Sequence, residues 1–181
     1  GHVDSGIGSA FVIYGKKSYS DLDLTAGTIH SSAGIAIIGA NSDGMGWSLS
    51  GAGDVNGDGL SDIIVGAVSI ASAYVVYGST SAASIDLSAG TIASSVGFKL
   101  SNGGTSYAGY ANSSAGDMNG DGFADVVYGA YGSGNVFVVY GGNTVPSLNL
   151  NLSMASNVGF KITGLAGTAG AGGPPGGQCA A

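Results

Sequence analysis

The chain has 181 residues and a formal net charge of −7, with 11 Asp against four Lys and neither Glu nor Arg. It therefore lacks the basic patch that binding to nucleic acid or to an anionic membrane surface requires, and we expect neither as a partner. Cys179 is the only cysteine, so no disulfide framework is present, and no apolar run approaches the ~20 residues needed for membrane insertion. Because its two histidines, His2 and His30, are isolated, we expect no catalysis within this chain.

In chain order, the first element is the apolar run FVIYG, which recurs as YVVYG and FVVYG. The tyrosines of the three copies, Tyr14, Tyr77 and Tyr140, are 63 residues apart, and the acidic segments GDVNGDGLSD and GDMNGDGFAD keep the same spacing. The chain is therefore a tandem repeat. It starts in register with the middle of a repeat, because Gly1 aligns with Ile64.

Each repeat is expected to hold four short strands. The candidates are runs of β-branched and aromatic residues separated by Gly, Ser and Asn, and none shows a sustained helical period. In the first full repeat they are residues 47–53, 62–67, 73–78 and 96–101, and in the second 110–116, 125–130, 136–141 and 158–163. Four antiparallel strands per repeat, with 36 Gly in the chain, predict an all-β fold of propeller-type blades.

The repeat register also predicts the domain organisation. We expect the second half of a blade over 1–38, full blades over 39–101 and 102–163, and a low-complexity tail over 164–181. Two and a half blades cannot close a ring, and their open faces would be adhesive. Two explanations stay open: the chain is a fragment of a longer propeller, or a neighbouring chain covers the open faces in a ring or an open fibre.

The acidic segment of the first full repeat is a candidate cation site. Its side-chain oxygens fall at positions 1, 3, 5 and 9 of a tight loop, on Asp54, Asn56, Asp58 and Asp62. Hard oxygen ligands at this spacing, with a backbone carbonyl near position 7, make a Ca²⁺ site of about six oxygens. Glycines in the loop allow the backbone to fold around the ion. The second copy offers Asp117, Asn119, Asp121 and Asp125.

Three other interpretations of this segment fit the sequence less well. An EF-hand needs a bidentate Glu at position 12, where Val65 and Tyr128 stand, and it needs flanking helices where strands are expected. Mg²⁺ is less suited to a wrapped loop made of protein ligands alone. A polar hairpin turn without metal would need only one Asn-Gly or Asp-Gly pair. The recurrence of the whole ligand set in register favours calcium.

The repeat resembles the FG-GAP repeat of integrin α-subunit β-propellers, and especially the 63-residue version of microbial extracellular proteins. The resemblance covers residues 1–163 and is carried by Gly46-Trp47 and Gly109-Tyr110, by the GDxNGDGxxD loops, and by the VGA or YGA and YVVYG runs. It implies that the acidic loop binds Ca²⁺ between the first two strands of a blade. The implied ligands add the carbonyls of Leu60 and Phe123 to the eight side chains above.

That resemblance implies an extracellular or cell-surface location and two functions. The first is a calcium-binding structural or adhesion module that associates with itself or with adjacent blades of a longer chain, as in a filament. The alternative is a carbohydrate- or protein-ligand-binding fragment of a larger secreted protein. An accessory domain of an enzyme encoded elsewhere in a longer chain is a third reading. The family normally has seven blades, which at this period would take about 440 residues.

Several other side chains are candidates for lesser roles. We expect Trp47, Tyr107, Tyr110 and Tyr131 to fill the core between blades rather than to form a sugar-binding platform. Asp23 and Asp86 are expected to cap turns, and Asp43 to lie in a solvated loop. The sequons at Asn112 and Asn151 are candidate glycosylation sites if the protein is secreted by a eukaryote, and Asn151 is expected to be the more accessible.

Overall fold

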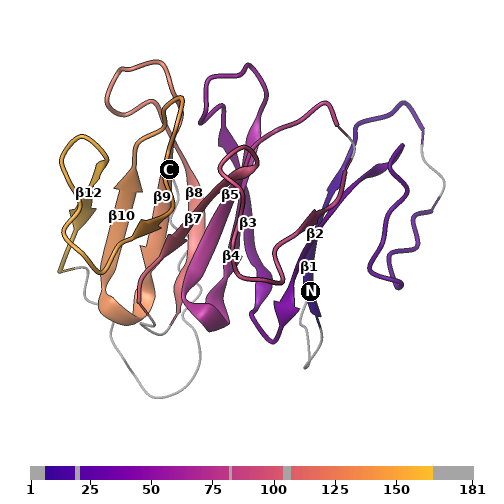
Figure 1. Ribbon diagram of the computed structural model, residues 1–181, viewed down its shortest axis with the longest axis horizontal. Coiled ribbons are helices and arrows are strands. Elements are labelled where there is room, and N and C mark those ends of the chain that lie inside the picture. The colour runs from indigo at the N-terminus through magenta and orange to yellow at the C-terminus, as the bar shows by residue number, and fades with distance from the viewer. Residues whose placement is uncertain (1–6, 19–20, 82, 104–106, 165–181) are drawn as a thin grey trace.

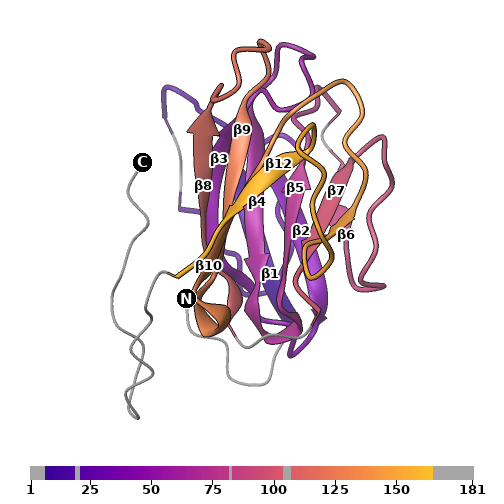
Figure 2. The same ribbon diagram turned by 90° about the vertical axis from the view of Figure 1, so that its left-hand side faces the viewer.

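The computed structural model describes residues 7–18, 21–81, 83–103 and 107–164. In this part of the chain the fold is all-β, with three sheets, none of which closes into a ring, and no α-helix (Figure 1). The sheets are stacked face to face, and their strands overlap when the molecule is turned by 90° (Figure 2). The predicted tail, apart from Gly164, lies outside the described residues, as does His2.

Two sheets confirm the predicted blades of four antiparallel strands. The middle sheet contains β3 (Met45–Gly53), β4 (Asp62–Ala67), β5 (Ser72–Val76) and β7 (Gly97–Ser101). The last sheet contains β8 (Ala108–Gly116), β9 (Asp125–Ala130), β10 (Asn135–Val139) and β12 (Gly159–Ile162). Single 3₁₀ turns, Val68–Ile70 and Tyr131–Ser133, link the second and third strands of each sheet.

The first sheet is built around one antiparallel pair, β1 (Ile7–Ile13) and β2 (Gly34–Asn41). Two short strands that the sequence reading missed extend the first and middle sheets. β6 (Ile85–Asp86) pairs in parallel with β2, and β11 (Leu148–Asn149) pairs in parallel with β7. Each short strand comes from the long connection before the fourth strand of one sheet, yet it adds to the edge of the preceding sheet.

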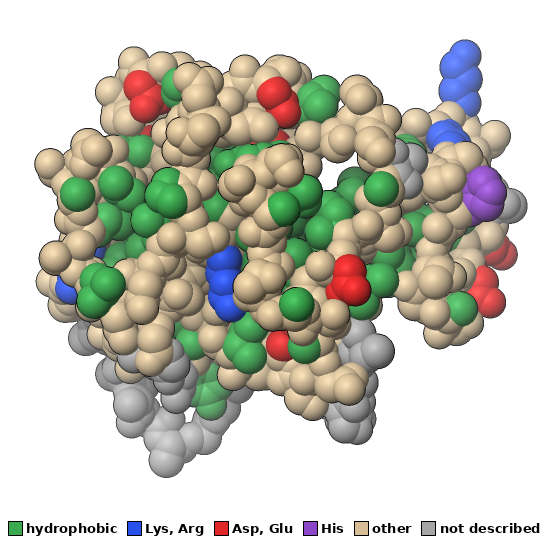
Figure 3. Space-filling view, in the orientation of Figure 1, with side chains coloured by type: hydrophobic (Ala, Val, Ile, Leu, Met, Phe, Trp, Pro, Cys, Tyr) green, Lys and Arg blue, Asp and Glu red, His purple; other side chains and the backbone are tan. Residues whose placement is uncertain are grey.

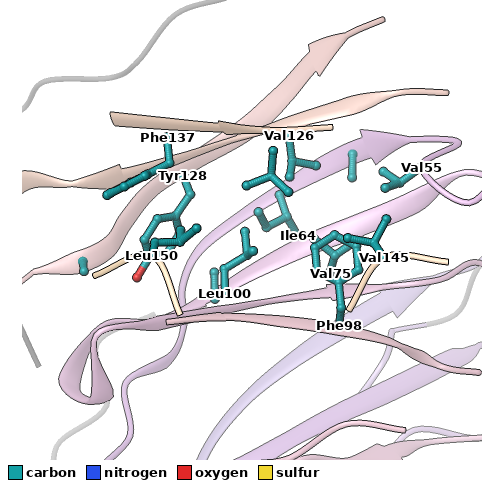
Figure 4. Close-up of a cluster of buried hydrophobic side chains, with 14 of the residues drawn as sticks. Val55, Ile64, Val75, Phe98, Leu100, Val126, Tyr128, Phe137, Val145 and Leu150 are labelled. Carbon is teal, nitrogen blue, oxygen red and sulfur yellow. The ribbon is translucent and has the colours of Figure 1, made fainter. Parts of the chain in front are cut away.

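Two hydrophobic clusters hold the three sheets together. The larger lies between the middle and last sheets and includes Ile64, Val75, Phe98, Tyr128 and Phe137 (Figure 4). The smaller lies between the first and middle sheets. Alternate residues of the middle sheet point into the two clusters, since successive side chains of a strand point to opposite faces. This explains why its strands read as continuous apolar runs. The described residues include no helix long and apolar enough to cross a membrane.

Candidate metal loops

Both acidic segments form loops between the first two strands of a sheet. The first loop joins β3 to β4, and the second joins β8 to β9, at the same rim of the molecule (Figure 1). Acidic side chains are visible at two places along this rim in the space-filling view (Figure 3). The repeat therefore presents its two candidate sites side by side.

The first loop wraps its backbone around the carboxylate of Asp54. Oδ1 of Asp54 accepts the N–H groups of Gly57 at 2.8 Å and Asp58 at 3.1 Å, and Oδ2 accepts that of Gly59 at 2.8 Å. Both glycines have a positive φ, +77° at Gly57 and +84° at Gly59. Side-chain-bearing residues rarely adopt this conformation, so the glycines of NGDG are what permit the loop to close.

Asn56 and Asp58 complete the interior of this loop. The Asn56 amide donates to Oδ2 of Asp58 at 2.9 Å, and its carbonyl oxygen accepts the Asp58 N–H at 3.0 Å. Oδ1 of Asp58 accepts the N–H of Leu60 at 2.8 Å. Three of the predicted ligand side chains are thus held in one tight turn by hydrogen bonds within the loop.

Asp62 has a different environment from the other acids of the loop. It is only 1% exposed; its Oδ2 accepts the N–H of Val55 at 2.8 Å and its Oδ1 accepts that of Gly78 at 2.7 Å. Burial raises the pKa of Asp62, the two N–H donors oppose that effect, and the charges of Asp58 and Asp54 add to it. Asp62 therefore anchors the loop to the strand that follows and lies within the field of its acidic neighbours.

The second loop reproduces every one of these bonds. The Asp117 carboxylate accepts the N–H groups of Gly120, Asp121 and Gly122, and the Asn119 amide donates to Asp121. The Asp121 N–H donates to Asn119, and the Phe123 N–H donates to Asp121. Asp125, which is fully buried, accepts the N–H groups of Met118 and Gly141.

Sequence reasoning missed the part played by Gly78 and Gly141. Both were read only as the ends of the YVVYG and FVVYG runs, yet each donates its N–H to the buried Asp of its loop. A Cβ on Gly78 would lie 2.6 Å from the Ser61 carbonyl oxygen, so no larger residue fits there. The signal was present in the strict 63-residue spacing of the Tyr-Gly pairs.

The two loops also contact each other across the sheets. The Ala124 N–H donates to the Asp54 carbonyl oxygen at 2.9 Å, and the Gly142 N–H donates to that of Val55 at 2.8 Å. A Cβ built on Gly57 would clash with the ring of Phe123, so this ring covers the first loop. The loops are therefore one connected layer rather than two independent turns.

The donor chemistry of the loops suits calcium. All the predicted ligands are oxygens; within the loop Asp54 uses three of its roughly four acceptor positions and Asp58 uses two, which leaves lone pairs for a cation. In the described part of the chain, no group of three His, Cys, Asp or Glu side chains is arranged to hold a metal ion. A bound ion would therefore have to draw on the Asn56 and backbone oxygens as well.

The four aromatic residues expected to fill the core between blades are not buried and form a cluster at the surface. Trp47 and Tyr107 are 52% and 53% exposed, and Tyr110 and Tyr131 are partly exposed. Their ring centroids form a continuous series, with Trp47 and Tyr110 5.4 Å apart and the three tyrosines 6.1 to 6.3 Å from one another. Trp47 lies near the start of β3, Tyr107 and Tyr110 lie at the start of β8, and Tyr131 lies in the turn that follows β9.

The remaining polar candidates act locally. Asp23 and Asp86 each accept a backbone N–H two residues on, which confirms their turn-capping role. The expectation for Asp43 is wrong: it is 3% exposed and accepts the N–H groups of Ala40 and Met45, because the β2–β3 turn folds over it. His30 is exposed and bonds Ser32.

The two sequons lie in contrasting places. The Nδ2 atom of Asn112, to which a glycan would be attached, donates to Oγ of Ser48 at 2.6 Å and to the Gly109 carbonyl oxygen at 3.0 Å. The bond to Ser48 joins the middle and last sheets, and a glycan on Asn112 would have to break both bonds. Asn151 is exposed just after β11. Glycosylation of Asn151 stays a prediction.

Comparison with known families identifies the repeat. The family model of the FG-GAP repeat matches residues 45–76 and 108–145, each of which runs from the first strand through the acidic loop to the third strand. A search of curated proteins finds no match. FG-GAP repeats form β-propeller-like modules and are typical of extracellular or surface proteins. From the match and the blade-like sheets that these residues form, the chain contains FG-GAP repeats at 45–76 and 108–145.

Proposed function

We propose that this protein is a calcium-binding structural or adhesion module of the extracellular space or cell surface. The observation that carries the proposal is the duplicated loop. Asp54 and Asp58 with Asn56, and Asp117 and Asp121 with Asn119, are held by the same set of hydrogen bonds in adjacent sheets. A turn without a ligand would need neither three carboxylates nor their repetition.

Electrostatics gives the loops a reason to take a cation. Each loop carries three carboxylates, and one Ca²⁺ in it would change the local charge from −3 to −1. Burial is the main cause of the raised pKa of Asp62, and the negative charges of Asp58 and Asp54 add to it. Lys99, one of the four lysines, lies instead over the Tyr74 ring and donates to the Gly90 carbonyl oxygen.

The ion would serve architecture rather than chemistry. Each loop connects the first two strands of a sheet, and the N–H groups of Ala124 and Gly142 join the first loop to the neighbouring repeat. Calcium would therefore stiffen the stack of sheets along one rim. The open faces of the stack would be covered by further copies or by adjacent blades, which suits a structural or adhesive role. Extracellular modules of this kind bind Ca²⁺ with dissociation constants of about 10⁻⁴ to 10⁻³ M.

Calorimetric titration of Ca²⁺ into protein stripped with EDTA tests the proposal. We expect two sites, and a stabilisation of about 1.4 kcal/mol per site at a free concentration tenfold above the dissociation constant. Asp54→Asn and Asp117→Asn should each remove one site, whereas Asp86→Asn, an exposed acid outside both loops, should keep two. No heat of binding together with an unchanged melting temperature after EDTA would refute the calcium site.

A second candidate function, carbohydrate binding, is favoured by the exposed aromatic cluster. The rings of Trp47, Tyr107, Tyr110 and Tyr131 adjoin one another near the starts of β3 and β8 and the turn after β9, and such rings stack against the apolar faces of sugars. A glycan array probed with the native protein and with Trp47→Ala tests it. Signals that persist in the variant, or no signal from either protein, would exclude this cluster as the binding site.

A further inference from the structure

The short parallel strands β6 and β11 join each sheet to the one before it. Ile85 lies opposite Ile37 of β2, and Leu148 lies opposite Leu100 of β7. In each segment the leucine two residues further along then completes the contact. Leu87 is 1% exposed in the cluster between the first and middle sheets, and Leu150 is 3% exposed in the cluster between the middle and last sheets.

The repeat contains a third copy of this joining segment. Residues 21–24, with the sequence DLDL, stand 63 residues before SIDL and 126 before SLNL. Within the described residues they pair with no strand. Leu22, the counterpart of Ile85 and Leu148, is 40% exposed, and Leu24 is partly exposed. The segment therefore has the sequence of a joining strand but adds to no sheet among the described residues.

The strand with which a joining segment pairs also occurs three times in the chain. β12 is the counterpart of β2 and β7, and it forms an edge of the last sheet in the described structure. Its Ile162 corresponds to Ile37 and Leu100, which are both fully buried beneath their joining strands, whereas Ile162 is 40% exposed. An edge strand with exposed apolar side chains is a template for pairing with another chain.

The outward faces of the last and first sheets also carry apolar side chains that correspond to those in the interface between the middle and last sheets. The outward face of the last sheet carries Val127, Val136, Phe160 and Ile162, at positions where the middle sheet has Ile64, Ala73, Phe98 and Leu100 against the last sheet. On the first sheet, Phe11 and Ile13 stand where the last sheet has Phe137 and Val139 in the same cluster. Phe160 is 37% exposed and Ile13 is 41% exposed. Each face thus repeats one side of an interface that already exists within the chain.

We infer that residues 21–24 of one copy of this protein add as a parallel strand to β12 of a second copy, head to tail. In the register of β6 and β11, Leu22 lies opposite Ile162 and Asp23 lies opposite Thr163. Leu24 then enters the apolar space between the last sheet of one copy and the first sheet of the next. This inference names the partner for the self-association proposed above and is independent of calcium.

The hydrogen bonds that β6 makes with β2 and β11 makes with β7 predict those between residues 21–24 and β12. Leu87 and Leu150 donate their N–H groups to the carbonyl oxygens of Ile38 at 2.8 Å and Ser101 at 2.7 Å, so the Leu24 N–H would donate to the Thr163 carbonyl oxygen. Oγ of Ser101 donates to the Leu148 carbonyl oxygen at 3.2 Å, a bond that the Thr163 hydroxyl would repeat with Leu22.

The remaining bond involves an outward N–H group of the acceptor strand. The N–H groups of Ala36 and Lys99 donate to Oγ of Ser84 and Ser147, at 3.3 and 3.0 Å. In the proposed joint the corresponding donor is the Lys161 N–H. Asp21 takes the place of the serines, and its carboxylate offers the acceptor oxygen.

Sedimentation velocity over a range of protein concentrations tests this joint. The native protein should show a mass that rises above that of the monomer as concentration increases. Leu24→Asp breaks the donor segment, and Lys161→Pro removes the outward N–H of the acceptor strand. Each variant alone should weaken self-association at least tenfold. Mixed in equal amounts they should form dimers but nothing larger, because each retains one intact half of the joint.

Control variants distinguish the loss of this strand pairing from unfolding and from the loss of calcium binding. Leu152→Asp alters another leucine, 70% exposed, in the corresponding connection of the last repeat, and Lys161→Ala keeps the backbone N–H. Both should associate like the native protein. Circular dichroism and calcium titration of Leu24→Asp and Lys161→Pro should match the native protein. A native protein that stays monomeric, variants that still associate, or a mixture without dimers would overturn the joint whatever the calcium titration shows.

Discussion

The carboxylate of Asp62 accepts the backbone N–H of Gly78 at 2.7 Å, although 16 residues separate the two in the chain. The same bond joins Asp125 to Gly141 at 2.9 Å in the next repeat. The last acid of each loop is thus tied to the end of the third strand of its own sheet. The position of the loop therefore depends on the sheet, not only on the turn sequence.

Replacing Asp62 by Ala tests the anchoring role. The change leaves the N–H groups of Val55 and Gly78 without their acceptor, and unpaired buried donors cost about 1–3 kcal/mol each. We expect the free energy of unfolding in calcium-free buffer to fall by about 2–4 kcal/mol, measured by urea denaturation. Asp86→Ala, which removes an exposed acid with one local bond, should cost about 1 kcal/mol or less. Equal losses in the two variants would contradict the anchor.

The Tyr-Gly pairs allow a matched glycine comparison. A Cβ on Gly78 would lie 2.6 Å from the Ser61 carbonyl oxygen and 2.8 Å from Cβ of Leu60, whereas one on Gly15 would meet nothing within 4 Å. Gly78→Ala should therefore lower the free energy of unfolding by about 1–3 kcal/mol, the range for overpacking. Gly15→Ala should change it by about 0.5 kcal/mol or less. Thermal unfolding of both variants checks the difference.

Two buried tyrosines should respond in opposite directions to loss of the hydroxyl. The Tyr128 hydroxyl donates to the Ala71 carbonyl oxygen at 2.8 Å, whereas that of Tyr74 is buried with no hydrogen-bond partner among the described residues. Tyr128→Phe should destabilise the protein by about 1 kcal/mol, and Tyr74→Phe should stabilise it by a similar amount. Urea denaturation of the pair measures both signs, and a destabilised Tyr74→Phe would show that this hydroxyl has a partner.

The same tyrosines predict how stability depends on alkaline pH. Burial raises the pKa of Tyr74 to about 12 and raises that of Tyr128 as well, so folding disfavours the ionised ring. A raised pKa means that the stabilisation is complete below the pKa of the unfolded chain, near 10, and is lost as the pH rises through the folded value. The melting temperature should fall from about pH 10 upward. It should fall less steeply in Tyr74→Phe, and identical profiles would contradict the assignment.

Glycosylation should discriminate between the two sequons. Expressed through the secretory pathway of a eukaryotic host, the protein should carry a glycan on Asn151, which is exposed, and none on Asn112, whose amide is bonded to Ser48 and Gly109. Peptide mass spectrometry measures the occupancy of each site, with Asn151→Gln as the control. A glycan on Asn112 would mean that the middle and last sheets separate there during folding.

Much of the fold was readable from the sequence. The period of 63 residues, the strands around Ile64 and Val126, and the closed loops at Asp54 and Asp117 depend on local residue patterns. Repeats amplify such patterns, because each feature appears twice in the same register. The turn-capping role of Asp23 was also predictable, because its hydrogen bond reaches only two residues along the chain.

The tertiary structure decided the features that join separate parts of the chain. A two-residue strand such as Ile85–Asp86 has no periodicity of its own, and its pairing with β2 depends on an edge supplied by another repeat. The exposure of Trp47 depends on which surfaces the neighbouring sheets leave uncovered. The burial of Asp43 depends on how one turn folds back over its carboxylate. Local residue patterns determine the pieces of this protein, and contacts between distant residues determine how the pieces are joined.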